Sequence, residues 1–208
     1  MVERHKSDKV HLQVVEKHPP VLLSFFLKTG HWRHLFEEAK YNWIIAKALN
    51  AWVEEEEENI GESKVASFEL AGYLITGRKL GLVLKIKKKE LKPALRRFYE
   101  FLNERIAENL ENREEELHDA LNDDDTDSNV RFHNLFEKKM PMNPYLVKLI
   151  TGREVRIPYY DPRLARLEKN IRHYNFCSAI DYSQAIGPVK IKLLSKEELD
   201  KLERITDD

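Results

Sequence analysis

Two apolar runs joined by a short Thr-Gly-Arg-Lys turn constrain the fold of this chain more than any other feature. The runs cover residues 66–75 and 80–87, and their length and composition predict two antiparallel strands of one hairpin. The second run is apolar on both faces, because Leu82 and Leu84 alternate with Val83. A strand with two apolar faces is typical of a sheet interior, so we expect residues 80–87 to form a central strand.

The segments on either side of this hairpin alternate between strand and helix patterns. Residues 21–27 form an apolar run typical of a buried strand, and residues 32–56 place apolar side chains at helical spacing. Residues 89–118 repeat the helical pattern after the hairpin. This order predicts an α+β domain with a ferredoxin-like antiparallel sheet and both long helices on one face. Trp43 and Phe98 lie on the two apolar stripes, so we expect both to be buried against the sheet.

Changes in composition divide the chain into four parts. We expect a flexible N-terminal segment at 1–20, the ferredoxin-like core at 21–120, an acidic loop at 121–130, and a C-terminal extension at 131–208 that completes the domain. The extension contains patterns of both kinds of secondary structure. They predict a completing strand at 154–158, a helix at 162–174, an edge strand at 188–193, and a terminal helix that opens with a capping box from Ser195 to Glu198.

Composition limits the classes of function that the chain can have. The 208 residues are 42% hydrophobic, which is enough for a folded core, and the net charge of −1 neither requires nor excludes a nucleic-acid partner. Cys177 is the sole cysteine, so an internal disulfide and a multi-cysteine zinc site are excluded. Neither a signal peptide, a membrane span nor a glycine-rich phosphate loop is apparent. We therefore expect a soluble cytoplasmic protein without a cofactor or a membrane partner.

Four segments share their order and part of their residues with one known family. They are residues 21–49, with Leu-Phe-Glu at the start of the first helix; the apolar positions of the hairpin 73–86; Asn-Leu-Phe-Glu-Lys-Lys at 134–139; and 164–183, which includes Arg-His-Tyr-Asn-Phe. In these segments the chain resembles the small tyrosine transposases of the IS200-like and REP-associated type. The resemblance implies a ferredoxin-like core, single-stranded or hairpin DNA as partner, and a homodimer.

The metal-binding residues of that family are replaced in this chain. In the family, the second strand of the hairpin carries a His-apolar-His pair that holds a divalent ion while a tyrosine hydroxyl attacks the scissile phosphate. The matching positions here are Lys79, whose ammonium group cannot bind a metal ion at neutral pH, and Gly81, which has no side chain. The resemblance therefore implies a degenerate member without metal-dependent nicking activity. We assign no catalytic residue and no metal ligand, and we do not assign the C-terminal tyrosines Tyr159, Tyr160, Tyr174 and Tyr182 as nucleophiles.

Basic residues gather around the starts of both long helices. A cation at a helix N-terminus opposes the helix dipole by ~0.3–1 kcal/mol, so helix stability does not explain the second group. Contact with phosphates would explain it, and solvation of an exposed face is the competing interpretation. The predicted nucleic-acid-binding residues are Lys79, Lys85, Lys88, Lys89, Lys92, Arg96 and Arg33.

Two other functions stay open on the sequence alone. One is a protein-interaction or structural module with the same layout and no nucleic-acid role. The other is an active transposase whose metal ligands come from elsewhere, such as His31, His34 or His173. Convergence of polar residues around Lys79 and Gly81 in the folded protein would favour an enzyme.

Overall fold

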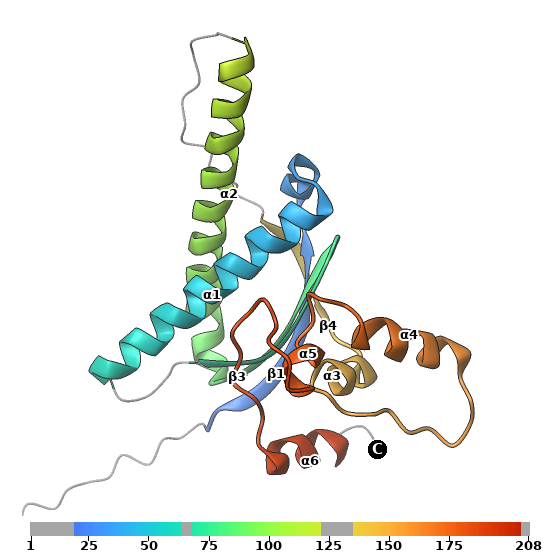
Figure 1. The fold of residues 1–208 in the computed structure, drawn as a ribbon. Helices are drawn as coiled ribbons and strands as arrows, with labels where there is room; N and C mark the ends of the chain where they lie inside the picture. The colour runs from blue at the N-terminus through green and yellow to red at the C-terminus, as the bar shows by residue number, and fades with distance from the viewer. Residues whose placement is uncertain (1–18, 64–67, 122–134, 205–208) are drawn as a thin grey trace, which may run out of the picture.

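The computed structural model describes residues 19–63, 68–121 and 135–204 (Figure 1). The expectations for residues 1–18 and for most of the acidic loop at 121–130 lie outside these ranges. Within the described residues the chain is a mixed α and β structure, which confirms the α+β class predicted from the sequence.

Four strands of the described chain form one antiparallel sheet. They are β1 (Val21–Thr29), β2 (Phe68–Thr76), β3 (Lys79–Ile86) and β4 (Phe136–Pro141), in the order β2-β3-β1-β4. The hairpin turn is closed by the Thr76 hydroxyl, which donates to the Lys79 carbonyl oxygen at 3.0 Å. Strand β3 lies between β2 and β1, so the prediction of a central strand is confirmed.

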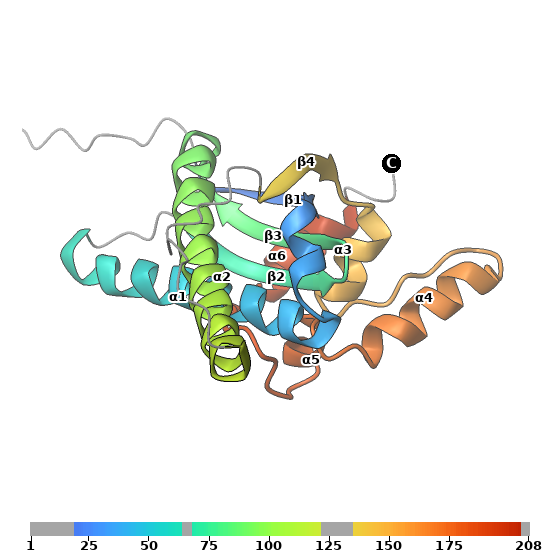
Figure 2. The same ribbon diagram turned by 90° about the horizontal axis from the view of Figure 1, so that it is seen from above.

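Two long helices contribute to the larger hydrophobic core. Helix α1 (Glu38–Ser63) follows the 3₁₀ helix η1 (His31–Leu35), and helix α2 (Leu91–Leu121) follows the 3₁₀ helix η2 (Lys88–Glu90). Buried side chains of α1 and α2 pack with alternate residues of the strands, and Figures 1 and 2 show both helices on the same side of the sheet. Among the described residues, no helix combines the length and the apolar character that crossing a membrane requires.

The orientation of α1 differs from the prediction, whereas that of α2 agrees with it. Trp43 is 51% exposed, and the buried indole is that of Trp52, which is only 1% exposed. The helical pattern was extended from residue 32, but Phe36 is extended and α1 begins only at Glu38. Residues 32–37 therefore do not belong to α1, and the buried face of the helix contains Trp52 instead of Trp43. The prediction for Phe98 is correct, because its side chain is fully buried.

The C-terminal extension covers the other face of the sheet. It contains α3 (Pro144–Ile150), α4 (Pro162–Arg172), α5 (Ala179–Tyr182) and α6 (Lys196–Arg204). Side chains from these helices and their connections form a second core against β2 and β3. Figure 2 shows the sheet between the two helical layers, with β4 at one edge and β2 at the other.

Two predicted strands of the extension are wrong. Residues 154–158 are irregular and partly exposed, and the strand beside β1 is β4. Residues 188–193 form no regular strand, although the Lys192 amide donates to the Leu70 carbonyl of β2 at 2.9 Å. Their backbone pairs with a helix instead, because the Asn50 side chain donates to the Pro188 carbonyl at 2.9 Å and accepts from the Lys190 amide at 2.8 Å.

The predicted capping box of the terminal helix is confirmed. The Ser195 amide donates to the Glu198 carboxylate at 2.9 Å, and the Glu198 amide donates to the Ser195 hydroxyl at 3.3 Å. The predicted helix at 162–174 is present as α4, which ends at Arg172.

Candidate nucleic-acid interface

A groove of about 440 Å³ lies between the first turns of α2 and strand β4. Three predicted nucleic-acid-binding residues, Lys88, Lys92 and Arg96, meet in its wall because positions four apart share one face of a helix. We call this surface the basic groove, and its lining residues are Lys88, Leu91, Lys92, Leu95, Arg96, Tyr99 and Lys139.

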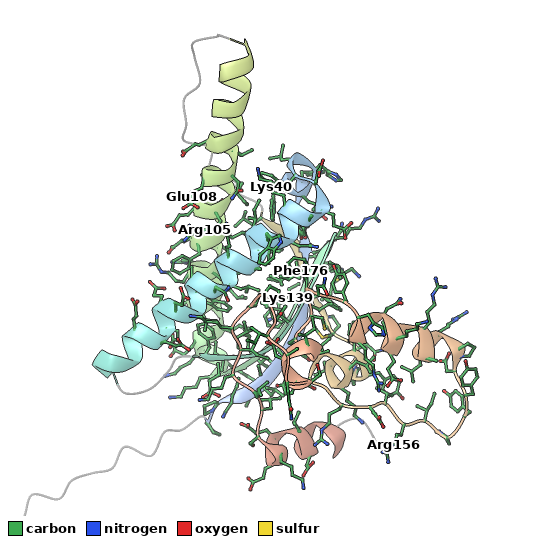
Figure 3. The ribbon with its side chains drawn as sticks, in the orientation of Figure 1. Lys40, Arg105, Glu108, Lys139, Arg156 and Phe176 are labelled. Carbon is green, nitrogen blue, oxygen red and sulfur yellow. The ribbon has the colours of Figure 1, made fainter. Side chains whose placement is uncertain are left out.

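Lys139 is a cation of the groove that sequence reasoning missed. It lies on β4 in register with Leu27 of β1, so its side chain projects to the face that α1 and α2 cover. Its ammonium lies 4.2 Å from the centre of the Phe25 ring, which places the charge above an aromatic face (Lys139 is labelled in Figure 3). The sequence shows only a Lys138-Lys139 pair, which does not predict the position of either side chain unless residues 136–141 are recognised as a strand.

No carboxylate is among the residues that line the basic groove. Within the described part of the chain, no ion pair involves Lys88, Lys92 or Arg96. Arg97, one residue further along α2, instead pairs with Glu55 of α1 and with Glu100. The positive charge in the groove is therefore not neutralised locally, and it attracts anions.

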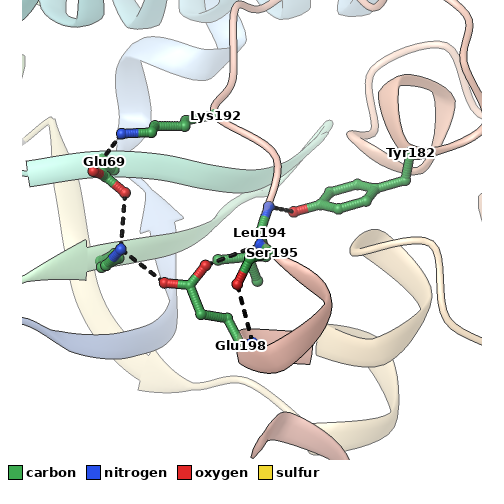
Figure 4. Close-up of polar contacts among 7 residues, drawn as sticks. Glu69, Tyr182, Lys192, Leu194, Ser195 and Glu198 are labelled. Atoms are coloured by element: carbon green, nitrogen blue, oxygen red, sulfur yellow. Dashed lines mark hydrogen bonds and ion pairs between the residues drawn. The ribbon is translucent and has the colours of Figure 1, made fainter. Parts of the chain in front are cut away.

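Lys85 is engaged on the opposite face of the sheet. Its ammonium lies 2.7 Å from a Glu198 carboxylate oxygen and 3.3 Å from Glu69, and Glu69 also binds Lys192 (Figure 4). The hydrogen bond from Lys85 is the main reason that the pKa of Glu198 is lowered to about 2, with the Ser195 amide adding to the effect. This network joins β2 and β3 to the start of α6.

Arg33 and Lys89 also lie outside the groove lining. The Arg33 guanidinium donates to the carbonyl oxygens of Gly77 and Phe36 at 2.8 and 2.7 Å, so it connects η1 to the hairpin turn. It also lies 4.6 Å from the centre of the Tyr41 ring. The exposed Lys89 ammonium lies 3.7 Å from Glu90.

Lys79 and Gly81 lie on the face of β3 that points away from α1 and α2. The Lys79 ammonium is 5.5 Å from the centre of the Phe26 ring. A Cβ atom added at Gly81 would lie 2.8 Å from the Met142 methyl and 3.0 Å from the Phe26 ring. An imidazole at position 81 would therefore require Phe26 and Met142 to move.

The other residues considered for chemistry are dispersed. His31 and His34 line a second concavity of about 520 Å³ at the end of the sheet, together with Lys28 and Arg78, whereas His173 follows the last turn of α4. Among the described residues, no group of three or more His, Cys, Asp or Glu side chains is arranged to hold a metal ion.

The C-terminal tyrosines do not meet at either concavity. Tyr159 and Tyr160 are exposed in the segment before α4. Burial raises the pKa of the partly buried Tyr174. The Tyr182 hydroxyl donates to the Ala71 carbonyl at 2.9 Å, which connects α5 to β2. It also accepts from the Leu194 amide at 3.1 Å, in the segment before α6 (Figure 4).

Comparisons of the chain with models of known protein families, with curated proteins and with solved structures give no match. The functional assignment therefore depends on the residues of the basic groove and on their geometry.

Proposed function

We propose that this protein binds nucleic acid through the basic groove and is a transposase-like protein without metal-dependent nicking activity. One observation supports the binding role most directly: Lys88, Lys92, Arg96 and Lys139 line the groove together with Tyr99, and no carboxylate lines it. Three of these cations were predicted from the sequence, and the fold adds the fourth from a strand more than 40 residues away.

The composition of the groove matches the two parts of a nucleic-acid strand. Lysine and arginine side chains contact phosphates, and each phosphate that they neutralise releases counterions. Tyr99, Leu91 and Leu95 add apolar surface to the same lining, and an aromatic ring beside cations is suited to contact unstacked bases. A groove with both features favours single-stranded or hairpin DNA, the ligand that the family resemblance implies.

The relationship to tyrosine transposases is part of the same proposal. The element order β1-α1-β2-β3-α2-β4 and the strand order β2-β3-β1-β4 support a ferredoxin-like core. The close packing of Phe26 and Met142 around Gly81 supports the loss of nicking activity. A homodimer and a cytoplasmic location complete the proposal. Light scattering tests the first of these by giving the molecular mass in solution.

The binding role is tested with the variant K92Q/R96Q/K139Q. Fluorescence anisotropy with a labelled 20-nucleotide oligo(dT), and with a hairpin DNA, gives the binding constant at several salt concentrations. Each phosphate contact on a single strand contributes about 0.7 to the slope of log K against log salt concentration, so the three substitutions should flatten that slope by about 2.

The matched control removes three exposed lysines from other surfaces, Lys47, Lys169 and Lys196, and should leave the slope unchanged. Circular dichroism verifies that both variants are folded. If the native protein does not bind at low salt, or if the groove variant keeps the native slope, the binding role is wrong. The interaction-module alternative would then be preferred.

A further inference from the structure

A row of three lysines crosses the sheet on the face opposite the basic groove. Lys28 of β1 lies directly across from Lys79 of β3 on one side and from Lys138 of β4 on the other. Directly paired residues project to the same face, and like charges in such pairs destabilise a sheet. Sheet stability therefore does not explain this arrangement, which we call the lysine row.

Much of the charge of the lysine row is not neutralised by its surroundings. Lys28 pairs with the Glu137 carboxylate. Lys79 lies over the Phe26 ring, and within the described residues no carboxylate pairs with Lys79 or with Lys138. At least two cations of the row are thus free to bind an anion.

The lysine row and the basic groove meet at the edge of the sheet. Among the described strands β4 lies at an edge of the sheet, as Figure 2 shows, and it contributes Lys138 to the row and Lys139 to the groove. Because consecutive residues of a strand project to opposite faces, these two lysines connect the two basic surfaces around β4.

An aromatic side chain lies beside the lysine row, in the same way that Tyr99 lies among the cations of the groove. Phe26 is the next residue of β1 that projects to this face, and it is partly exposed. Its ring packs on Gly81, where the absence of a Cβ atom leaves room for it. Lysines next to an exposed ring are suited to bind phosphates while a base stacks on the ring.

We propose that one single strand of nucleic acid contacts both surfaces by turning around the β4 edge. This inference depends on the proposed function of the basic groove, and it adds the path and the strandedness of the ligand. A ligand that passes around one edge strand must reverse its direction between the two faces of a single sheet. Duplex DNA has a persistence length of about 50 nm and cannot make that turn, whereas a flexible single strand can.

The test compares two double variants of equal charge change. K79Q/K138Q alters the lysine row and leaves the Lys28–Glu137 pair intact, while K92Q/R96Q alters the groove. K169Q/K196Q is the matched control. Each of the first two variants should flatten the salt slope for 20-nucleotide oligo(dT) by about 1.4, and the control should not change it. A 20-base-pair duplex can contact only one surface, so only one of the two variants should change its slope.

The outcomes separate this inference from the proposed function. If K92Q/R96Q flattens the oligo(dT) slope and K79Q/K138Q does not, the path around β4 is wrong and the groove is still the binding site. If neither variant changes the slope, both proposals are wrong. Stoichiometry gives an independent result: one oligonucleotide per chain is expected, and two per chain would overturn the single continuous path.

Discussion

The Lys85 ammonium on β3 lies 2.7 Å from the Glu198 carboxylate on α6, and this ion pair joins the sheet to the terminal helix of the described chain. Its contribution depends on pH, because the folded-state pKa of Glu198 is lowered from 4.5 to about 2. A carboxyl group with a lowered pKa stabilises the folded state above its ordinary pKa, and that contribution is lost as the pH falls toward the folded-state value.

Glu198→Gln should therefore lower the free energy of unfolding by ~0.2–1 kcal/mol at pH 7, the range measured for exposed ion pairs. The difference from the native protein should shrink between pH 4.5 and pH 2. Glutamine can still accept from the Ser195 amide, so the helix cap is retained. The change in unfolding free energy then measures the contribution of the Glu198 negative charge. Urea unfolding at several pH values measures the effect, with the exposed Glu197→Gln as control. A pH-independent difference would contradict this explanation.

Asn50→Ala should lower the free energy of unfolding by ~1–3 kcal/mol. The substitution removes two hydrogen bonds and leaves the Pro188 carbonyl and the Lys190 amide without their partner. Hydrogen exchange should show the Lys190 amide losing protection before the strands of the sheet do. Asn175→Ala, at an exposed position within the C-terminal extension, should change the free energy of unfolding by less than ~0.5 kcal/mol.

Gly81→Ala should destabilise the protein by ~1–3 kcal/mol, because the new methyl group overlaps Met142 and Phe26. In a chain that already carries Met142→Ala, Gly81→Ala should cost less, because one of the two overlaps is removed. Gly77→Ala is the control, since its Cβ would approach the flexible ends of two side chains, Glu38 at 3.3 Å and Arg33 at 3.6 Å. Thermal unfolding of the single and double variants gives the coupling between positions 81 and 142. Additive effects would show that the overlap is not the cause.

Trp52→Ala and Trp43→Ala should differ several-fold in their effect on stability. Trp52 is buried and stacks on Phe68 with ring centres 4.0 Å apart, so its loss should cost ~3–5 kcal/mol. Trp43 is half exposed and contacts Phe176 edge-on at 5.4 Å, so its loss should cost less than ~1.5 kcal/mol. Urea unfolding with a common probe of secondary structure measures both values. Equal losses of stability would contradict the finding that Trp52 is buried and Trp43 is half exposed.

Local periodicity was sufficient to predict the hairpin, the two long helices and the capping box. Alternation over 80–87 and apolar spacing over 89–118 each depend on residues close in the chain, and the structure contains both elements. The sequence grouped Lys88, Lys92 and Arg96 only as basic residues around the start of the second helix, and the structure shows that these three line one groove.

Tertiary pairing decided the rest. The burial of Trp52 rather than Trp43 depends on where α1 begins against the sheet, and residues 188–190 pair with Asn50 rather than with a strand. Strand β4 has no strong pattern of its own and is defined by its pairing with β1. The sequence determined which residues are basic. The fold alone brought Lys139 to the groove and Lys28, Lys79 and Lys138 into one row, because strand pairing joins residues that are far apart in the chain.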